Sequence, residues 1–147
     1  MKVVNRKARY DYEIFDKIEA GIALKGAEVK SVKEGKIKIN DAFVKIIGNE
    51  IWLINAHIHP YKFADNQNYK ADRQRKLLLH RREILHLIKK IENRNLTLVP
   101  LSCYNKGPKI KIEIAIGKGK KKWEKKEKKK RQDIDREIER TLKISNF

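Results

Sequence analysis

Apolar and polar residues alternate most regularly over residues 109–116. Isoleucine occupies every second position from 110 to 116, and Lys, Glu and Ala residues lie between. A period of two is typical of a β-strand that buries one face. The β-prone segment 96–104 precedes this pattern, and Asn105-Lys106-Gly107-Pro108 lies between the two with the composition of a turn. We therefore expect the two segments to form an antiparallel hairpin.

The same kind of pattern predicts further strands. Residues 42–47 and 50–56 flank Gly48-Asn49, a pair favoured in two-residue hairpin turns. Tyr10, Tyr12 and Ile14 alternate as well, and residues 21–25 are expected to form a short strand. At least six mostly antiparallel strands joined by short turns favour a small closed or nearly closed barrel.

Helices are few in this interpretation. Residues 81–93 place Ile84, Ile88 and Ile91 on one face at helical spacing, so this helix is expected to lie against the barrel. His86 is expected on its surface. Residues 27–34 are expected to form a shorter helix that ends before Gly35. Near the end of the chain an apolar stripe recurs every four residues, at Ile134, Ile138 and Leu142.

Charge divides the chain into two parts. The 147 residues carry 37 Lys and Arg against 19 Asp and Glu, a net charge of +18 that favours a polyanionic partner such as nucleic acid. Residues 117–131 alone hold ten Lys and Arg and two Glu. The prediction is a mainly β RNA-binding barrel over residues 1–116. A basic tail over 117–147 is expected to be disordered alone and helical on a partner.

Other functions find little support in the residues. Cys103 is the only cysteine, so we expect a small buried hydrophobe and a reducing, cytoplasmic compartment. No stretch without charged residues is longer than residues 51–61, which is far shorter than the roughly 20 residues of a membrane span. Phosphate-loop, dinucleotide and serine-nucleophile motifs are absent from the sequence, so no catalytic residue or cofactor is expected.

An alternative to a protein that only binds RNA is a metal-dependent hydrolase, and it would rest on His57 and His59. Two residues apart on a strand, they point to the same face and could in principle hold a metal for a hydrolase. Without a nearby Cys or acidic ligand, the expectation is that no metal binds there.

Two groups of residues are candidates for RNA contact. Trp123 lies among the cations of the tail, where it could stack on a base while lysines hold phosphates. The bland alternative is a solvated tail. Cations also surround the triplet Leu77-Leu78-Leu79, namely Arg73, Arg75, Lys76, Arg81 and Arg82. Either this junction of strand and helix docks on folded RNA, or the leucines are core and the charges incidental.

Five blocks of sequence resemble those of one family, the small protein B or SsrA-binding proteins of bacteria. They are N-R-K-A-R-Y-D-Y from Asn5, E-A-G-I-A-L-K-G-A-E-V-K-S-V from Glu19, N-A-H-I-H-P-Y from Asn55, R-K-L-L-L-H-R-R-E-I from Arg75 and L-T-L-V-P-L from Leu96. The resemblance implies an oligonucleotide-binding-like barrel. It also implies a non-enzymatic adaptor that carries transfer-messenger RNA (tmRNA) to stalled ribosomes for trans-translation.

The resemblance also implies site residues. Contacts to the tRNA-like domain of tmRNA are expected at Asn5, Arg6, Glu19, Arg75, Lys76, Leu78, His80 and Lys111. Contacts to the decoding centre of the ribosome and the empty message channel are expected from the tail, at Lys118, Gly119, Lys120, Lys121, Trp123, Glu124, Lys125 and Lys126. Glu124 and Lys126 stand where the family usually has Asp and Arg.

The implied partners are tmRNA, the small-subunit rRNA of the 70S ribosome and, through the RNA, elongation factor Tu. The protein itself is expected to be a monomer. The competing interpretation is a general ribosomal or single-strand RNA-binding barrel.

Overall fold

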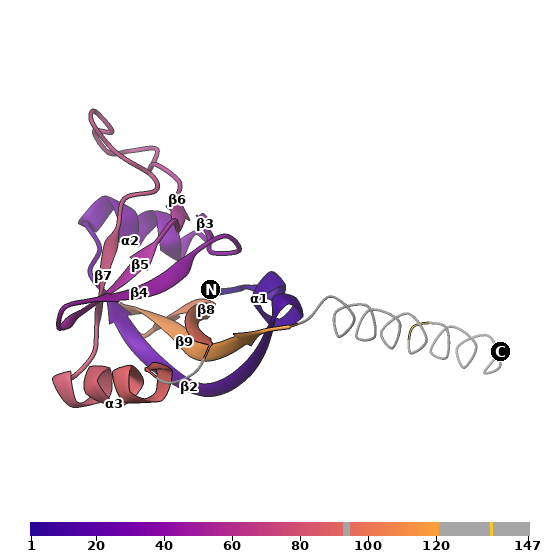
Figure 1. Cartoon of the computed structure of the whole chain (residues 1–147). Coiled ribbons are helices and arrows are strands. Elements are labelled where there is room, and N and C mark those ends of the chain that lie inside the picture. The colour runs from indigo at the N-terminus through magenta and orange to yellow at the C-terminus, as the bar shows by residue number, and fades with distance from the viewer. Residues whose placement is uncertain (93–94, 121–135, 137–147) are drawn as a thin grey trace, which may run out of the picture.

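The chain folds into a β-barrel with helices around it (Figure 1). The structure is a computed structural model, and it describes residues 1–92, 95–120 and 136. Its helices are α1 (Arg6–Asp11), α2 (Gly26–Lys33) and α3 (Arg81–Ile91). Its strands are β1 (Lys2–Val4), β2 (Tyr12–Ile22), β3 (Ile37–Lys38), β4 (Phe43–Ile47), β5 (Glu50–Ile54), β6 (His57–Ile58), β7 (Arg75–Leu78), β8 (Leu96–Lys106) and β9 (Lys109–Gly119).

The main sheet closes on itself. Its strand order is β1-β8-β4-β5-β7-β2-β9, and β9 also pairs with β8, so the strands from β8 round to β9 form a ring. Every pairing is antiparallel, including that of the separate pair β3 and β6. The mainly β prediction is confirmed, and the closed ring is consistent with the expected oligonucleotide-binding-like barrel.

Both predicted hairpins are present. Strands β4 and β5 meet at the pair Ile47 and Glu50, and Gly48 between them has a φ of 63°. Strands β8 and β9 meet at Lys106 and Lys109, with Gly107 at a φ of 61°. Positive φ is readily adopted by glycine, so these two residues allow the chain to reverse within two positions.

The alternating isoleucines build the core. Ile110, Ile112, Ile114 and Ile116 are all buried, and α3 adds Ile84 and Leu87 from its inner face. His86 is exposed on the outer face of α3, as predicted. Cys103 is also fully buried, and this burial raises the pKa of its thiol to about 12. A thiol that stays protonated at neutral pH packs as a small hydrophobe, which confirms the prediction for this residue.

The start of the chain differs from the prediction. Tyr10 lies in helix α1 and not in a strand. The reason is Asn5, which caps α1 by accepting a hydrogen bond from the Ala8 N–H at 3.1 Å. Likewise, the short strand expected at residues 21–25 is the end of the long strand β2, which stops at Ile22.

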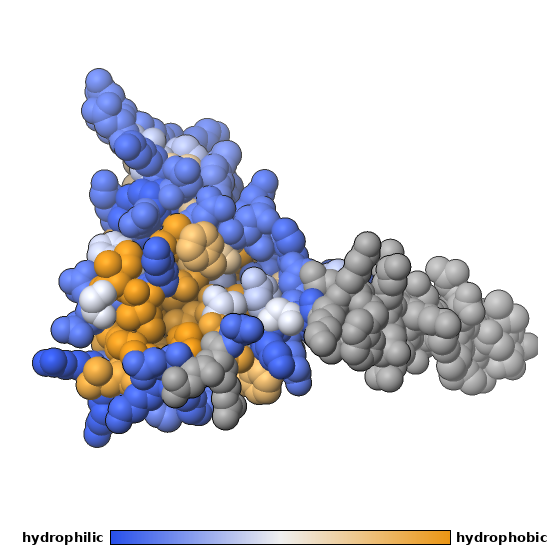
Figure 2. Space-filling view, in the orientation of Figure 1, coloured by the Kyte–Doolittle hydropathy of each residue, from blue (hydrophilic) through white to orange (hydrophobic). Residues whose placement is uncertain are grey.

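The ring is thinnest between β4 and β8. These strands share the single pair Val44 and Leu98, whereas β8 and β9 pair along almost their full length. Where β4 and β8 separate, an apolar groove of about 410 Å³ remains, and Ile88 and Ile91 of α3 line one side of it. Figure 2 shows apolar side chains gathered on this face. Within the described part of the chain, none of the helices is long and apolar enough to cross a bilayer.

Candidate nucleic-acid interface

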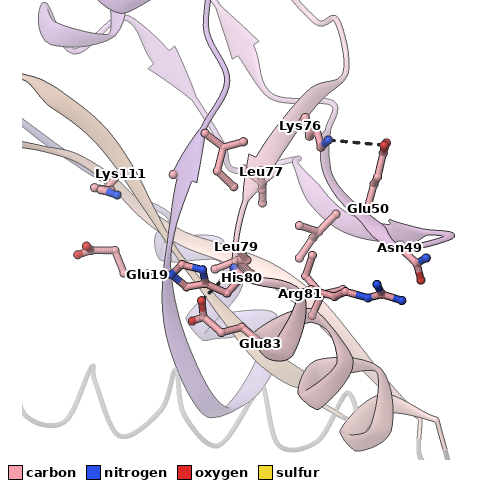
Figure 3. A pocket seen from close by; sticks show the side chains of 14 residues that line it. Glu19, Asn49, Glu50, Lys76, Leu77, Leu79, His80, Arg81, Glu83 and Lys111 are labelled. Carbon is pink, nitrogen blue, oxygen red and sulfur yellow. Dashed lines mark hydrogen bonds and ion pairs between the residues drawn. The ribbon is translucent and has the colours of Figure 1, made fainter.

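A hollow of about 540 Å³ lies where β7 leads into α3 (Figure 3). It is lined by five of the residues expected to contact RNA: Glu19, Lys76, Leu78, His80 and Lys111. Three elements that are distant in sequence supply them, namely β2, the β7–α3 junction and β9. In Figure 3, Glu19 and Lys111 lie on one side of the hollow and Lys76 with Glu50 on the other. The fold therefore brings these five predicted residues together.

Gly21 makes room for Leu78. In the sheet, Gly21 pairs with Leu78 on one side and with Lys111 on the other. A β-carbon at position 21 would lie 3.2 Å from the Leu78 β-carbon, which is too close for comfortable packing. The glycine thus lets the Leu78 side chain lie across the strand with 53% of its surface exposed, although it is apolar. An exposed leucine beside cations suits contact with a base or ribose face.

The leucine triplet contributes both to the core and to the surface, so each of its two alternative interpretations holds for part of it. Leu77 is buried in the barrel core, and Leu78 faces the hollow. The alternation of a β-strand produces this division, because successive side chains point to opposite faces.

The N-terminus of α3 opens onto the hollow. His80 precedes the helix, and its backbone N–H donates a hydrogen bond to the Glu83 Oε1 atom at 3.1 Å. His80 and Arg81 are both exposed there. Because a helix N-terminus carries partial positive charge, it favours an approaching phosphate.

Glu19 is held by two neighbours from β8. The Tyr104 hydroxyl donates a hydrogen bond to the Glu19 Oε2 atom, and the Lys106 Nζ atom lies 3.5 Å from Oε1. The hydrogen bond from Tyr104, together with Lys106, lowers the pKa of Glu19 below its usual value. Burial and the adjacent carboxylate raise the pKa of Tyr104. At neutral pH the pair is therefore a phenol donating to a charged carboxylate.

The hollow is mixed in charge. Glu19, Glu50 and Glu83 line it together with Lys76, Arg81 and Lys111. Lys76 lies 3.5 Å from Glu50, and both side chains are nearly half exposed. An exposed ion pair contributes only about 0–1 kcal/mol, so Lys76 can exchange Glu50 for a phosphate at little cost. Such a surface suits selective recognition, whereas the net charge of the whole chain favours RNA in general.

Two residues expected to contact RNA are buried instead. Asn5 is 2% exposed, and its Nδ2 donates hydrogen bonds to the carbonyl oxygens of Ile39 at 3.1 Å and Pro100 at 2.8 Å. Arg75 is fully buried. Both side chains hold segments of the fold together, so the expectation of direct contact is corrected for these two positions.

Arg75 belongs to a buried ion cluster that the sequence interpretation missed. Its Nε atom donates to the Glu28 Oε2 atom at 2.8 Å, and Arg73 donates to the other carboxylate oxygen. Burial alone would raise the pKa of Glu28, but the hydrogen bonds from Arg73, the Lys25 backbone and Arg75 lower it below its usual value. A signal was available: Arg75 and Leu77 are two apart on a strand and so point to the same, inner face.

The remaining predicted residues lie elsewhere. Arg6 is exposed on α1 and does not line the hollow. Lys118 and Gly119 are exposed at the end of β9, and the Lys120 backbone N–H donates to the Asp11 carbonyl at 2.9 Å. The other tail residues expected to contact the ribosome, Lys121, Trp123, Glu124, Lys125 and Lys126, lie outside the described residues.

The two histidines form no recognisable metal site. The ring centres of His57 and His59 are 6.2 Å apart. Within residues 1–92, 95–120 and 136, no group of three His, Cys, Asp or Glu side chains could hold a metal ion. The hydrolase alternative gains no support from this geometry.

A closed antiparallel barrel on a strongly basic chain, with a hollow of mixed charge at one helix N-terminus, is typical of the class of small RNA-binding barrel proteins. The family model described as SmpB protein matches residues 2–144, and the chain belongs to the SmpB family.

Several proteins and a solved structure are similar to this chain over most of its length. The SsrA-binding protein of Carboxydothermus hydrogenoformans is 49% identical over 139 residues, which cover 95% of this chain and 93% of that protein. The SsrA-binding protein of Trichormus variabilis is 51% identical over 140 residues, covering 95% and 90%. A chain in a solved structure described as "tmRNA-SmpB: a journey to the center of the bacterial ribosome" has a TM-score of 0.68 and 43% identity, covering 82% of this chain and 85% of that one.

Proposed function

We propose that this protein is an adaptor that binds the tRNA-like domain of tmRNA and delivers the RNA to stalled ribosomes for trans-translation. The observation that carries the proposal is the hollow, which collects Glu19, Leu78, His80 and Lys111 from separate parts of a chain of the SmpB family. The names of the relatives, SsrA-binding proteins, and the tmRNA–SmpB structure support the same partner.

In this proposal the hollow recognises folded RNA without covalent chemistry. Lys76, Lys111 and the N-terminus of α3 bind phosphates, and Leu78 packs against a base or ribose. Glu19, held as a carboxylate, accepts hydrogen bonds from base amino groups or ribose hydroxyls. Because a carboxylate repels misplaced phosphates, Glu19 contributes selectivity more than affinity.

The chain then divides its work between two parts. The boundary expected after residue 116 falls instead after β9, whose residues 117–119 still pair with β2. Residues 1–120 bind the tRNA-like domain, and residues 121–147 enter the decoding centre and the empty message channel. Elongation factor Tu takes part only through the RNA. A cytoplasmic location follows from the ribosomal role, and the proposed activity needs no catalytic residue.

The test is a competition experiment near physiological salt. Labelled tRNA-like domain is bound to the protein and challenged with unlabelled tRNA-like domain, elongator tRNA and unstructured RNA of matched length. Strong competition by the tRNA-like domain alone supports the proposal. Equal competition by all three RNAs would favour the alternative of a general RNA-binding barrel.

A substitution connects this test to the hollow. Leu78→Ala removes an exposed apolar contact and is expected to weaken binding of the tRNA-like domain roughly 5- to 30-fold. The matched control is Leu85→Ala, because Leu85 is similarly exposed on α3 at 45% but does not line the hollow. Equal effects of the two substitutions would remove the hollow from the proposal.

A further inference from the structure

The segment between β6 and β7 projects from the barrel (Figure 1). Near its start this segment passes α2, where Lys30 on α2 and Tyr61, Lys62 and Phe63 of the segment form a compact cluster that we call the aromatic tip. The rings of Tyr61 and Phe63 meet edge to face with 5.6 Å between their centres. The Lys30 Nζ atom lies 5.5 Å from the centre of the Tyr61 ring, and the Lys62 Nζ atom lies 5.7 Å from that of Phe63.

Phe63 has no part in the core. With 78% of its surface exposed, it is the most exposed of the large apolar side chains in the described residues. A single exposed apolar residue is ordinary, but this one is paired with a second ring and flanked by cations. The arrangement places a flat apolar face beside positive charge in solvent.

The base of the projecting segment is held firmly. At its start, the Ser31 hydroxyl donates to the His59 carbonyl at 2.6 Å. Within it, the Tyr69 hydroxyl donates to the Ile58 carbonyl at 2.9 Å. At its end, Arg73 and Arg75 bind the buried Glu28. A segment anchored at both ends presents its aromatic tip from a defined place, which lowers the entropy lost when a ligand binds.

We propose that the aromatic tip is a second RNA-binding site, which stacks an unpaired nucleobase on Phe63 and holds the neighbouring phosphates with Lys30 and Lys62. Stacking on an aromatic face beside cations is how proteins bind single-stranded nucleic acid with little sequence preference. None of these four residues lines the hollow at the β7–α3 junction. The inference therefore goes beyond the proposed function and adds an independent contact to single-stranded RNA.

The first test measures affinity for single-stranded oligouridylate by fluorescence anisotropy, using the full chain. Salt is raised to the highest concentration at which the wild type still binds measurably, because ionic contacts weaken steeply with salt and stacking does not. Phe63→Ala is expected to weaken binding roughly 5- to 100-fold, whereas Phe63→Trp retains it. The matched control is Phe43→Ala, since Phe43 is 44% exposed on β4. Wild-type affinity for Phe63→Ala, or an equal loss for Phe43→Ala, would overturn the proposal.

The second test locates the contact directly. Single-stranded RNA carrying 5-iodouridine is irradiated in complex with the wild-type protein, and crosslinked peptides are identified by mass spectrometry. We expect crosslinks at Phe63 or Tyr61 that unlabelled RNA of the same sequence competes away. Crosslinks confined to other peptides would overturn the proposal.

The two sites fail separately in these experiments. Leu78→Ala is expected to weaken binding of the tRNA-like domain more than binding of oligouridylate, and Phe63→Ala is expected to do the reverse. If Phe63→Ala binds single-stranded RNA normally, the proposed function still stands. If the tRNA-like domain is not bound selectively, the aromatic tip can still bind single-stranded RNA. A partner protein at the aromatic tip would give wild-type RNA affinity for Phe63→Ala, which is one of the results that overturn the inference.

Discussion

Glu19 shows how one acidic side chain can belong to a surface that binds a polyanion. Its carboxylate accepts a hydrogen bond from Tyr104 and lies near Lys106, so its orientation is set from β8 before any ligand arrives. A negative charge lowers the affinity for RNA in general. It is nevertheless useful here, because the carboxylate repels misplaced phosphates and accepts hydrogen bonds from bases. The sequence resemblance pointed to Glu19, but Tyr104, 85 residues away in the chain, gave no local signal.

Tyr104→Phe tests this positioning role. The substitution removes the hydroxyl donor and keeps the ring, so binding of the tRNA-like domain should weaken roughly 2- to 10-fold. In a double-mutant cycle with Glu19→Gln, the two losses should be less than additive, because both substitutions break the same hydrogen bond. Additive losses would mean that Tyr104 does not act through Glu19. A loss that follows a fall in melting temperature would mean that Tyr104 acts on stability.

A titration offers a second measurement of the same residue. The pKa of Glu19 is lowered, so its carboxylate is charged at neutral pH and is neutralised only as the pH falls below the ordinary value of about 4.5. Because an imidazole changes charge in the neutral range, the test uses a His80→Gln variant. Its selectivity for the tRNA-like domain over elongator tRNA is expected to stay constant between pH 6 and 8. Competition binding across this pH range measures the selectivity. A change in selectivity would mean that another titrating group is responsible for the recognition.

At the scale of elements, the Glu28 cluster joins α2 to the strand that supplies the hollow. Arg75 opens β7, and its guanidinium also donates to the carbonyls of Ala56 at 2.9 Å and Ala71 at 2.8 Å. The cluster thus holds the start of β7, the end of the projecting segment and α2 in one arrangement. Both RNA-binding sites that we propose therefore depend on the Glu28 cluster for their position.

Glu28→Gln should lower the free energy of unfolding by about 3–5 kcal/mol, because it leaves Arg75 buried without its counter-charge. The sign with pH follows from the lowered pKa of Glu28. A carboxylate of lowered pKa adds stability above its unfolded pKa, and the addition is lost as the pH falls through the folded pKa. Denaturant unfolding below about pH 4.5 should therefore show a steeper loss for the wild type than for Glu28→Gln. Parallel losses would contradict the role of the cluster.

Local pattern explains which elements could be predicted. The isoleucines of β9 and the glycine turns after β4 and β8 carry their structure in neighbouring residues, so the hairpins were predictable. Helix α1 was missed although its cap at Asn5 is local, because the alternation of Tyr10, Tyr12 and Ile14 favoured a strand. The hydrogen bonds that Asn5 donates to the carbonyls of Ile39 and Pro100 gave no local signal, since these residues lie 34 and 95 positions away. The resemblance identified residues of the hollow but gave no sign that they lie together. Their proximity depends on sheet pairing between distant segments, as between Gly21 and Leu78.

At the scale of the whole molecule, ring closure separates the fold from the tail. Strand β9 pairs with both β2 and β8, and Lys120 is bonded to Asp11 where β9 has just ended. Among the described residues, the pairings of the ring therefore end at Gly119, before the basic tail begins.

Removal of residues 121–147 is expected to leave the melting temperature within about 2 °C, because the strand pairings that the structure describes end at Gly119. The truncated protein should bind the tRNA-like domain but lose rescue of ribosomes on messages without a stop codon. Thermal unfolding, competition binding and a reconstituted translation assay measure these three effects. Retained rescue would refute the role proposed for the tail.

Strand β9 also acts as a ruler. Lys111 lines the hollow and Gly119 ends the strand, so eight steps of extended chain separate them, a path of roughly 26 Å. An inserted residue would shift the register against both neighbouring strands and turn inward-facing isoleucines outward. Insertion or deletion of single residues in β9 therefore cannot change the distance between the hollow and the start of the tail without disrupting the barrel. Variation in reach within this architecture has to come from the tail itself.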